Sequence, residues 1–247
     1  MRTLVVLPTY QEAPNVELVL RRIRASLPEA TVLVVDDGSP DGTAALARRA
    51  AAELGRVEVL ERPGKAGLGS AYRTGFSWGL DHGYEVLVEM DADLSHDPAA
   101  LELLVAGVVG GADLVIGSRY VAGGSIPAWS VHRLVLSRWG NRYAAAMLGL
   151  CVRDATSGFR AYRAEAVRAI DLDQVRADGY GFQIEMAYRI TGAAGNVVEV
   201  PIAFVDRVEG VSKMSGRIVF EALLLVTGWG LRDRWRRLVA GPVHRRR

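Results

Sequence analysis

The sequence is poor in residues that form disulfides or act as catalytic bases. Its 247 residues contain one cysteine, Cys151, so no disulfide can form within the chain, and a lone thiol suits a reducing cytosol. Four histidines are scattered along the chain, and there is no obvious histidine base among them. These absences argue against a disulfide scaffold.

No hydrophobic run reaches the length of about 20 residues that a membrane span needs. The nearest candidate, residues 218–231, is shorter and contains Glu221. At the N-terminus, the apolar run 3–7 ends at Pro8, so we expect no signal peptide. The sequence therefore predicts a chain that does not cross a bilayer by itself.

Charges of the two signs nearly balance, with 30 basic and 28 acidic residues and a net charge of +2. So small an excess gives no reason to expect a nucleic acid partner. Half of the residues are hydrophobic, which is typical of a globular protein with a large core. Arginine is concentrated in residues 232–247, and such a basic tail can contact anionic lipid headgroups.

Short runs rich in valine, isoleucine and leucine alternate with helix-like segments. The expected strands are residues 3–7, 31–35, 57–60, 85–90, 114–116 and 197–200. This alternation predicts an α/β fold with a parallel sheet covered on both faces, and ligands of such sheets bind beyond the carboxyl ends of the strands. Polar clusters follow Leu7, Val35 and Met90, so we expect a site where these ends meet.

Two aspartates, Asp91 and Asp93, directly follow the expected strand at residues 85–90. Side chains two apart lie on one side of a strand, so both carboxylates would lie together at its end. Carboxylate oxygens suit a hard divalent cation, which often carries a diphosphate. Aspartates also cap polar turns, so this segment alone leaves both interpretations open.

Seven short motifs occur along the chain. They are PTYQE at 8–12, VDDGSPDGT at 35–43, KAGLG at 65–69, MDADLSH at 90–96, GSRY at 117–120, TSGFR at 156–160 and GVSK at 210–213. This series resembles the polyprenol-phosphate (dolichol-phosphate) mannose synthases of glycosyltransferase family 2, over residues 2–213. The resemblance implies the Rossmann-like GT-A fold, GDP-mannose as donor, a polyprenyl monophosphate as acceptor, and Mg2+ or Mn2+ as cofactor.

The resemblance also assigns site residues by position. The residues implied for the guanosine pocket are Pro8, Tyr10, Glu12, Val35 and Asp37. Asp91, Ala92 and Asp93 would hold the metal and the diphosphate, and Arg119, Arg207 and Lys213 would face the phosphates. Where some relatives use a glutamine as a further metal ligand, this sequence has Ser95, a weaker oxygen donor. From the residues alone, Asp37 could instead cap the helix near Thr43, and Glu12 could be an early-helix acid.

The chemistry implied by the resemblance needs no strong base, because a phosphate monoester is already anionic near neutral pH. In-line attack on mannose would give the β-mannosyl phosphate. For the acceptor phosphate we expect Arg119, Arg133 and Ser137, since the last two lie four apart on one helical face; Arg133 could also be a solvated charge. We expect Asp154 to orient Arg119 or Arg160.

Two further segments bear on the expected site. Gln183 and Glu185 could contact the sugar. Arg207 and Lys213 bracket a loop containing Gly210, which suits a lid over the diphosphate, although an exposed basic loop has the same pattern.

The apolar segments 131–150 and 218–229 have tryptophan and arginine near their ends, which suits an interfacial position on a membrane, with ordinary core packing as the alternative. For residues 218–229 we favour the membrane or a membrane-protein partner. We therefore expect a catalytic domain at residues 1–213 and, at residues 214–247, an amphipathic helix with an arginine-rich tail that faces a membrane or a partner. The expected location is peripheral, on the cytoplasmic face of the membrane, with an integral membrane protein as a possible further partner. Two alternatives remain: a polyprenyl-phosphate glucosyltransferase that uses UDP-glucose, and a non-catalytic subunit that recruits a membrane protein.

Overall fold

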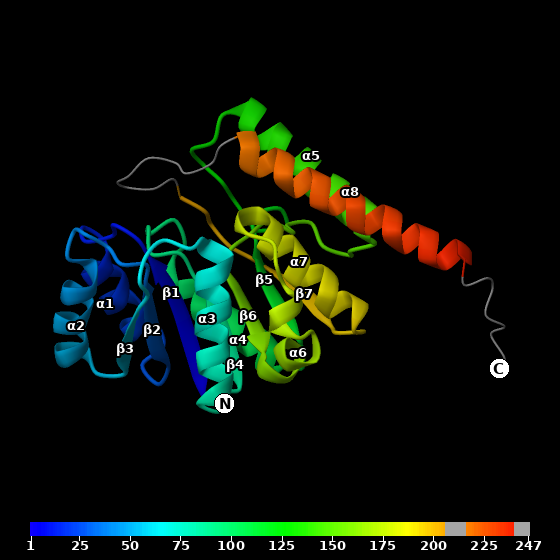
Figure 1. Ribbon diagram of the computed structural model, residues 1–247. Coiled ribbons are helices and arrows are strands. Elements are labelled where there is room, and N and C mark those ends of the chain that lie inside the picture. Colours follow the sequence, from blue (N-terminus) through cyan, green and yellow to red (C-terminus); the bar gives the residue numbers. More distant parts are fainter. Residues whose placement is uncertain (206–215, 240–247) are drawn as a thin grey trace.

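Seven strands pair into one sheet within residues 1–205 and 216–239, the part of the chain that the computed structural model describes. The strand order is β3-β2-β1-β4-β6-β5-β7, and Figure 1 shows the sheet at the centre of the molecule. The strands are β1 (Thr3–Thr9), β2 (Thr31–Asp36), β3 (Val57–Glu61), β4 (Val86–Glu89), β5 (Leu114–Ser118), β6 (Arg160–Arg163) and β7 (Val197–Pro201). Only β6 is antiparallel to its described neighbours, so the predicted mostly parallel sheet is confirmed.

The strand β6 is not among those predicted from the sequence. Its four residues, RAYR, include no β-branched side chain and only one aromatic, so their own strand signal is weak. The strand forms because it fills the gap between β4 and β5, pairing Ala161 with both Val88 and Val115. Ala161 and Tyr162 are fully buried, so tertiary packing outweighs the weak local preference.

Helices cover both faces of the sheet and divide the core into two clusters. Alternate side chains of β1 show the division: Leu4 and Val6 pack on one side, and Val5 and Leu7 on the other. Helices α1, α2 and α4 cover the second cluster, whereas α3, α5 and α7 cover the first. The helices are α1 (Val16–Ser26), α2 (Thr43–Leu54), α3 (Leu68–Asp81), α4 (Leu101–Val109), α5 (Val131–Leu148), α6 (Ala164–Ala169), α7 (Gly179–Gly192) and α8 (Gly216–Val239), with 3₁₀ turns η1 (Pro98–Ala100) and η2 (Leu172–Gln174).

Helix α8 lies beside α5 and over α7, away from the sheet (Figure 1). Its buried residues Ala222 and Val226 face the molecule, and the Thr227 hydroxyl lies 2.6 Å from the Tyr143 hydroxyl of α5. Within the described ranges, no helix combines the length and the apolar character that a membrane crossing requires.

Candidate active site

A cavity of about 660 Å³ opens at the carboxyl ends of β1, β2, β4 and β5, where the sequence predicts a site. Helix α8 contributes to its lining through Glu221, Ala222 and Leu225. The predicted site residues that line it are Pro8, Tyr10, Glu12, Asp37, Asp91, Ala92, Asp93, Ser95, Arg119 and Arg133. The structure therefore brings together residues from motifs that are far apart in the sequence.

Four other predicted residues are placed differently. Val35 is fully buried in the hydrophobic core and does not line the cavity. Ser137 lines a neighbouring pocket instead. Arg207 and Lys213, with the lid expected between them, lie outside the described residues.

Asp91 and Asp93 both face the cavity after the end of β4. Asp91 Oδ1 accepts a hydrogen bond of 3.1 Å from the Tyr72 hydroxyl. Burial and the Asp91 carboxylate raise the pKa of Tyr72 well above its ordinary value, so the phenol stays a donor. Asp93 Oδ1 accepts from the Ser95 N–H at 3.0 Å, across Leu94, whose φ is +61°. Asp93 thus closes a turn and also faces the cavity, so the two interpretations of this segment are compatible.

The oxygen atoms at this end of the cavity fit a divalent cation that arrives with a ligand. Ser95 Oγ is buried, and no hydrogen-bond partner for it is found within residues 1–205 and 216–239. The same part of the chain holds no group of three or more carboxylate, histidine or cysteine side chains suited to a metal ion. The protein can therefore offer the carboxylates of Asp91 and Asp93 with the Ser95 hydroxyl, and ligand oxygens must supply the rest.

Behind Asp91, the Glu89 carboxyl and the Arg160 guanidinium lie side by side and fully buried, with 3.5 Å between Oε1 and Nε. Burial raises the pKa of Glu89 to about 8, against the opposing effect of Arg160. The guanidinium of Arg160 also donates to two carbonyls of the loop 155–157 and to the carbonyl of Gln183, each at 2.7 Å. A single side chain thus ties this loop and α7 to the strand that carries Asp91.

Asp37 lies at the end of β2 and forms an ion pair with Arg62, whose Nε donates to Oδ1 at 2.6 Å. Its other oxygen accepts from the Ala66 N–H at 3.3 Å. The alternative in which Asp37 caps the helix near Thr43 is wrong, because the Thr43 N–H donates to Asp41. Asp37 instead connects the end of β2 to the loop before α3, on the side of the cavity where Pro8, Tyr10 and Glu12 lie.

Glu12 and Lys65, which line the cavity together with Asp37, each contact a neighbouring side chain. Glu12 Oε2 accepts a hydrogen bond of 3.0 Å from the Asn15 side chain near the start of α1. The Lys65 ammonium lies 4.6 Å from the centre of the Tyr10 ring, which is within cation–π range. Through Lys65, the loop after β3 therefore contacts Tyr10, which directly follows β1.

Arg119 follows β5 and forms a buried, bidentate ion pair with Asp154, as expected from the sequence. Asp154 Oδ2 accepts from Nε at 2.7 Å and Oδ1 accepts from Nη2 at 2.6 Å, and Nη2 also donates to Thr156 Oγ1. Although burial favours the neutral form, the Arg119 guanidinium lowers the pKa of Asp154 below its ordinary value. Because Asp154 uses both oxygens on Arg119, the cavity keeps a cation of fixed orientation.

Arg133 lies on α5 with its guanidinium 3.9 Å from the centre of the Trp129 ring, so it is not a fully solvated helix charge. Ser137, one turn later, accepts a hydrogen bond of 2.7 Å from the Tyr120 hydroxyl. Arg119 and Arg133 also line an adjoining, mostly apolar pocket of about 100 Å³ between α5, α7 and α8. The two arginines therefore lie where the larger, more polar cavity meets a mostly apolar one.

Of the two residues named as sugar contacts, only Gln183 lines the cavity. Glu185 accepts hydrogen bonds from the Arg176 and Ala177 N–H groups and from Arg189, so it holds the loop before α7.

Three aromatic residues that line the cavity are absent from the prediction: Trp129, Tyr180 and Phe204. The rings of Trp129 and Phe204 each lie 5.5 Å from the Arg119 guanidinium carbon. Phe204 follows β7 as Asp91 follows β4, so the position after a strand end could have identified it. Trp129 and Tyr180 lie next to helix starts and carry no such signal.

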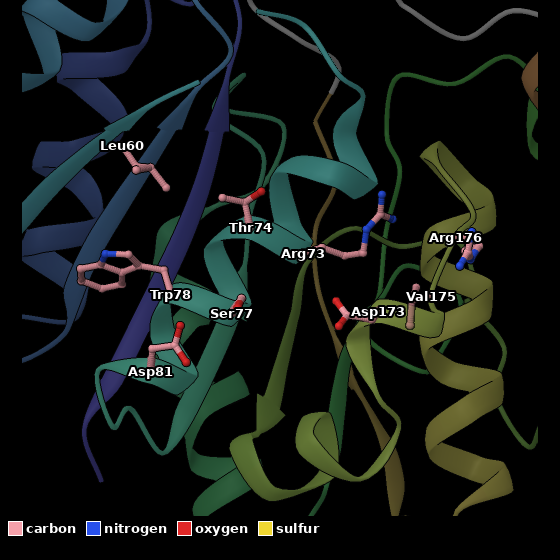
Figure 2. A pocket seen from close by; sticks show the side chains of 9 residues that line it. All are labelled: Leu60, Arg73, Thr74, Ser77, Trp78, Asp81, Asp173, Val175 and Arg176. Carbon is pink, nitrogen blue, oxygen red and sulfur yellow. The ribbon is translucent and has the colours of Figure 1, made fainter. Parts of the chain in front are cut away.

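A second hollow, of about 840 Å³, lies along the outer side of α3 (Figure 2). Figure 2 shows Thr74, Ser77 and Asp81 of α3 on one side of it and Asp173 and Arg176 on the other. Its lining includes none of the polar residues that follow β1, β2, β4 and β5. The cavity at the strand ends is therefore the candidate active site.

Comparisons with known proteins found a matching family model and similar sequences over nearly the whole chain. A model of the family described as glycosyl transferase family 2 matches residues 4–171. The polyprenol monophosphomannose synthase of Mycolicibacterium smegmatis is 52% identical over 234 residues, which cover 94% of this chain and 88% of that protein. The undecaprenyl-phosphate mannosyltransferase of Micrococcus luteus is 53% identical over 240 residues, covering 97% of this chain and 98% of that protein.

A solved structure shares the fold at much lower sequence identity. Glucosyl-3-phosphoglycerate synthase of Mycobacterium tuberculosis, in complex with Mn2+, UDP and glucosyl-3-phosphoglycerate, has a TM-score of 0.69 and 22% identity. The likeness covers 92% of this chain and 80% of that one. It supports the expected fold class.

Proposed function

This chain belongs to glycosyl transferase family 2, and we propose that it transfers mannose from GDP-mannose to a polyprenyl monophosphate, giving polyprenyl-phosphate β-mannose. The mannosyltransferase relatives support the reaction over nearly their whole lengths. One structural observation carries the proposal: a single cavity is lined by an acidic pair, Asp91 and Asp93, and by two arginines that also line an adjoining apolar pocket. That arrangement suits a nucleoside diphosphate and a lipid phosphate meeting in one cavity.

The donor lies on the side of the cavity formed by the strand ends. The guanosine contacts Pro8, Tyr10, Glu12 and Asp37, and the diphosphate extends towards Asp91, Ala92 and Asp93. Asp91, Asp93 and Ser95 would hold Mg2+ or Mn2+, which supplies positive charge to the departing GDP. Arg119, together with Arg207 and Lys213, is proposed to neutralise phosphate charge as the bond to mannose breaks.

The acceptor lies on the side formed by helices. Arg119 and Arg133 bind its phosphate, with Ser137 at the edge of the adjoining pocket. The apolar side chains of that pocket, which include Leu136, Leu223 and Val226, take the first isoprenoid carbons. A lipid phosphate fits this arrangement because its charged head and apolar chain need adjoining sites of opposite character.

No general base is required for this reaction, and two side chains that often serve as one, Asp154 and His96, are held by their neighbours. Asp154 uses both carboxylate oxygens on Arg119. His96 packs between Phe159 and Phe204, with ring centres 5.0 and 5.4 Å away. A phosphate monoester attacks as an anion, so the residues need only align it in line with the leaving group.

The outward face of α8 suits a membrane surface. Its exposed apolar residues recur at helical spacing, on the face opposite Ala222 and Val226: Phe220, Leu224, Leu231, Trp235 and Leu238. Exposed arginines follow on the same helix, and cations beside an apolar stripe favour an anionic interface. We propose peripheral binding at the cytoplasmic face of the membrane, with residues 214–247 as the membrane-facing part. An integral membrane protein is the alternative occupant of this face.

Sedimentation with anionic lipid vesicles tests the membrane proposal. Replacing Leu224 and Trp235 together with serine should reduce vesicle binding at least tenfold, since each apolar side chain withdrawn from water contributes about 1.5–3 kcal/mol. Replacing Leu18 and Leu103, which are exposed on α1 and α4, should have no effect. Unchanged binding of the α8 variant would favour a protein partner.

The transfer reaction is tested with purified protein, vesicles containing polyprenyl phosphate, Mg2+ or Mn2+ and radiolabelled GDP-mannose, with UDP-glucose in parallel. We expect a chloroform-soluble, mild-acid-labile product from GDP-mannose only. A product from UDP-glucose instead would favour the glucosyltransferase alternative. A lack of lipid product from either donor would favour the non-catalytic alternative and overturn the proposal.

A further inference from the structure

We infer that Gln183 and Gly158 form the subsite for the transferred sugar, with the Gln183 amide bonding a hydroxyl of the hexose. This inference rests on the proposed function and deepens it. It concerns which of this chain's own residues recognise the sugar.

The side chain of Gln183 is the first observation. Gln183 is 2% exposed and lines the cavity from α7. Neither Oε1 nor Nε2 has a partner in hydrogen-bonding geometry within residues 1–205 and 216–239, although the amide lies close enough to Glu89 to lower that carboxyl's pKa. A buried amide without such bonds is costly, and a ligand that fills the cavity can remove the cost. An amide both donates and accepts, which matches a sugar hydroxyl.

The space in front of Gly158 is the second observation. A Cβ added to Gly158 would lie 3.5 Å from Gln183 Nε2 and 3.6 Å from Asp91 Oδ2, both ordinary contact distances. The φ of Gly158 is not in the left-handed region either, so neither the backbone nor the packing requires glycine here. Gly158 lines the same cavity as Gln183 and Asp91, so a side chain at this position would take space beside them that a ligand could use.

The position of this space agrees with the chemistry. Asp91 marks the diphosphate side of the cavity, and Thr156, two residues before Gly158, bonds Arg119 on the acceptor side. A sugar that is transferred directly from the diphosphate to the acceptor phosphate must lie between Asp91 and Thr156. The Arg160 guanidinium holds both the loop before Gly158 and the backbone of Gln183, so the subsite is held rigidly before the donor binds.

The test compares two variants with a matched control. In Gln183→Met, the side chain keeps its approximate size and loses its hydrogen-bonding atoms. In Gly158→Ala, a methyl group takes up the part of the cavity beside Gln183. Gly192→Ala is the control, because it lies at the end of the same helix with nothing within 4 Å of an added Cβ. We expect kcat/KM for GDP-mannose to fall about tenfold or more in both variants and to stay unchanged in the control.

Binding of GDP, which lacks the sugar, separates this subsite from a general structural effect. Calorimetry with GDP and Mn2+ should give the wild-type Kd within about twofold for both variants. Neither variant should unfold at a lower temperature than wild type, and Gln183→Met should unfold at a slightly higher one, because the unsatisfied amide is gone. If both variants retain kcat/KM within about twofold, or if GDP affinity falls in parallel with transfer, the subsite is wrong. A wild-type protein that makes no lipid product from GDP-mannose would instead overturn the proposed function, and the subsite with it.

Donor analogues that each lack one mannose hydroxyl then test the role of Gln183 directly. For one analogue, the losses caused by the missing hydroxyl and by Gln183→Met should not add, because both remove the same hydrogen bond. Additive losses for every analogue would show that Gln183 binds none of these hydroxyls.

Discussion

The proposed donor side of the cavity is formed by strand ends and short turns, whereas the proposed acceptor side combines Arg119, after β5, with α5, α8 and the loop that leads into α5. On the donor side, Asp37 and Asp91 follow β2 and β4 directly, and the sheet fixes where they lie. On the acceptor side, Arg133 depends on how a helix packs on its neighbours. The difference teaches that polar residues after strands identify a site from sequence, whereas helix-borne residues do so only once the packing is known.

The largest expected effect is on the donor side. Asp91→Asn keeps the size of the side chain and removes its charge, so we expect transfer activity to fall about a thousandfold through lost stabilisation of the leaving GDP. Asp81→Asn, in the hollow of Figure 2, is the matched control and should leave activity unchanged. Initial rates of lipid-linked mannose formation measure both. Activity lost in the control and kept in Asp91→Asn would place the reaction in the hollow along α3 and not in the cavity at the strand ends.

The second prediction concerns the buried ion pair on the acceptor side. Asp154→Asn leaves the Arg119 guanidinium buried without its partner charge, which should lower the free energy of unfolding by about 3 kcal/mol. Denaturant unfolding measures this change. Conversely, the Glu17→Gln variant, at an exposed ion pair with Arg49, should differ from wild type by less than about 1 kcal/mol.

The same pair predicts an acid dependence whose sign follows from the lowered pKa of Asp154. A carboxyl whose pKa is lower when folded contributes stability above its unfolded pKa and loses it as the pH falls through the folded value. Wild type should therefore lose more stability than Asp154→Asn on acidification below the ordinary aspartate range. Equal losses would mean that the charge of Arg119 does not lower the pKa of Asp154.

The third prediction separates the two sides of the cavity by kinetics. Arg133→Gln should raise KM for the lipid phosphate about tenfold and leave GDP binding unchanged, because one charge-assisted hydrogen bond to phosphate is lost. Arg142→Gln, an exposed position on the same helix, is the control. Assays in detergent with a short-chain polyprenyl phosphate exclude effects of membrane binding. A matching loss of GDP affinity in Arg133→Gln would mean that the two sides are not separate.

The fold and the proposed donor side were largely predictable from sequence, because their signals are local. The features that were missed depend on packing between distant segments. The strands β1, β2 and β4 are apolar runs with polar residues directly after them, so their pattern carries both structure and site. The strand β6 and the arrangement of Trp129 with Arg133 depend on packing between distant segments, which no local pattern records. The sequence offered two partners for Asp154, Arg119 and Arg160, and only the structure shows that Asp154 pairs with Arg119.

The smallest expected effect tests how firmly the donor side is held. Tyr72→Phe removes only the hydroxyl that donates to Asp91, and the ring keeps its stacking on Phe182 at 5.8 Å between centres. We expect activity to fall by about three- to tenfold, because one neutral donor to a carboxylate contributes about 1 kcal/mol. Asp91 loses orientation rather than charge, so raising the Mn2+ concentration should not restore the rate, whereas it would if the hydroxyl acted through metal affinity. An effect as large as that of Asp91→Asn would mean that the strand end alone does not position the carboxylate, and that this side relies on helix packing as much as the acceptor side does.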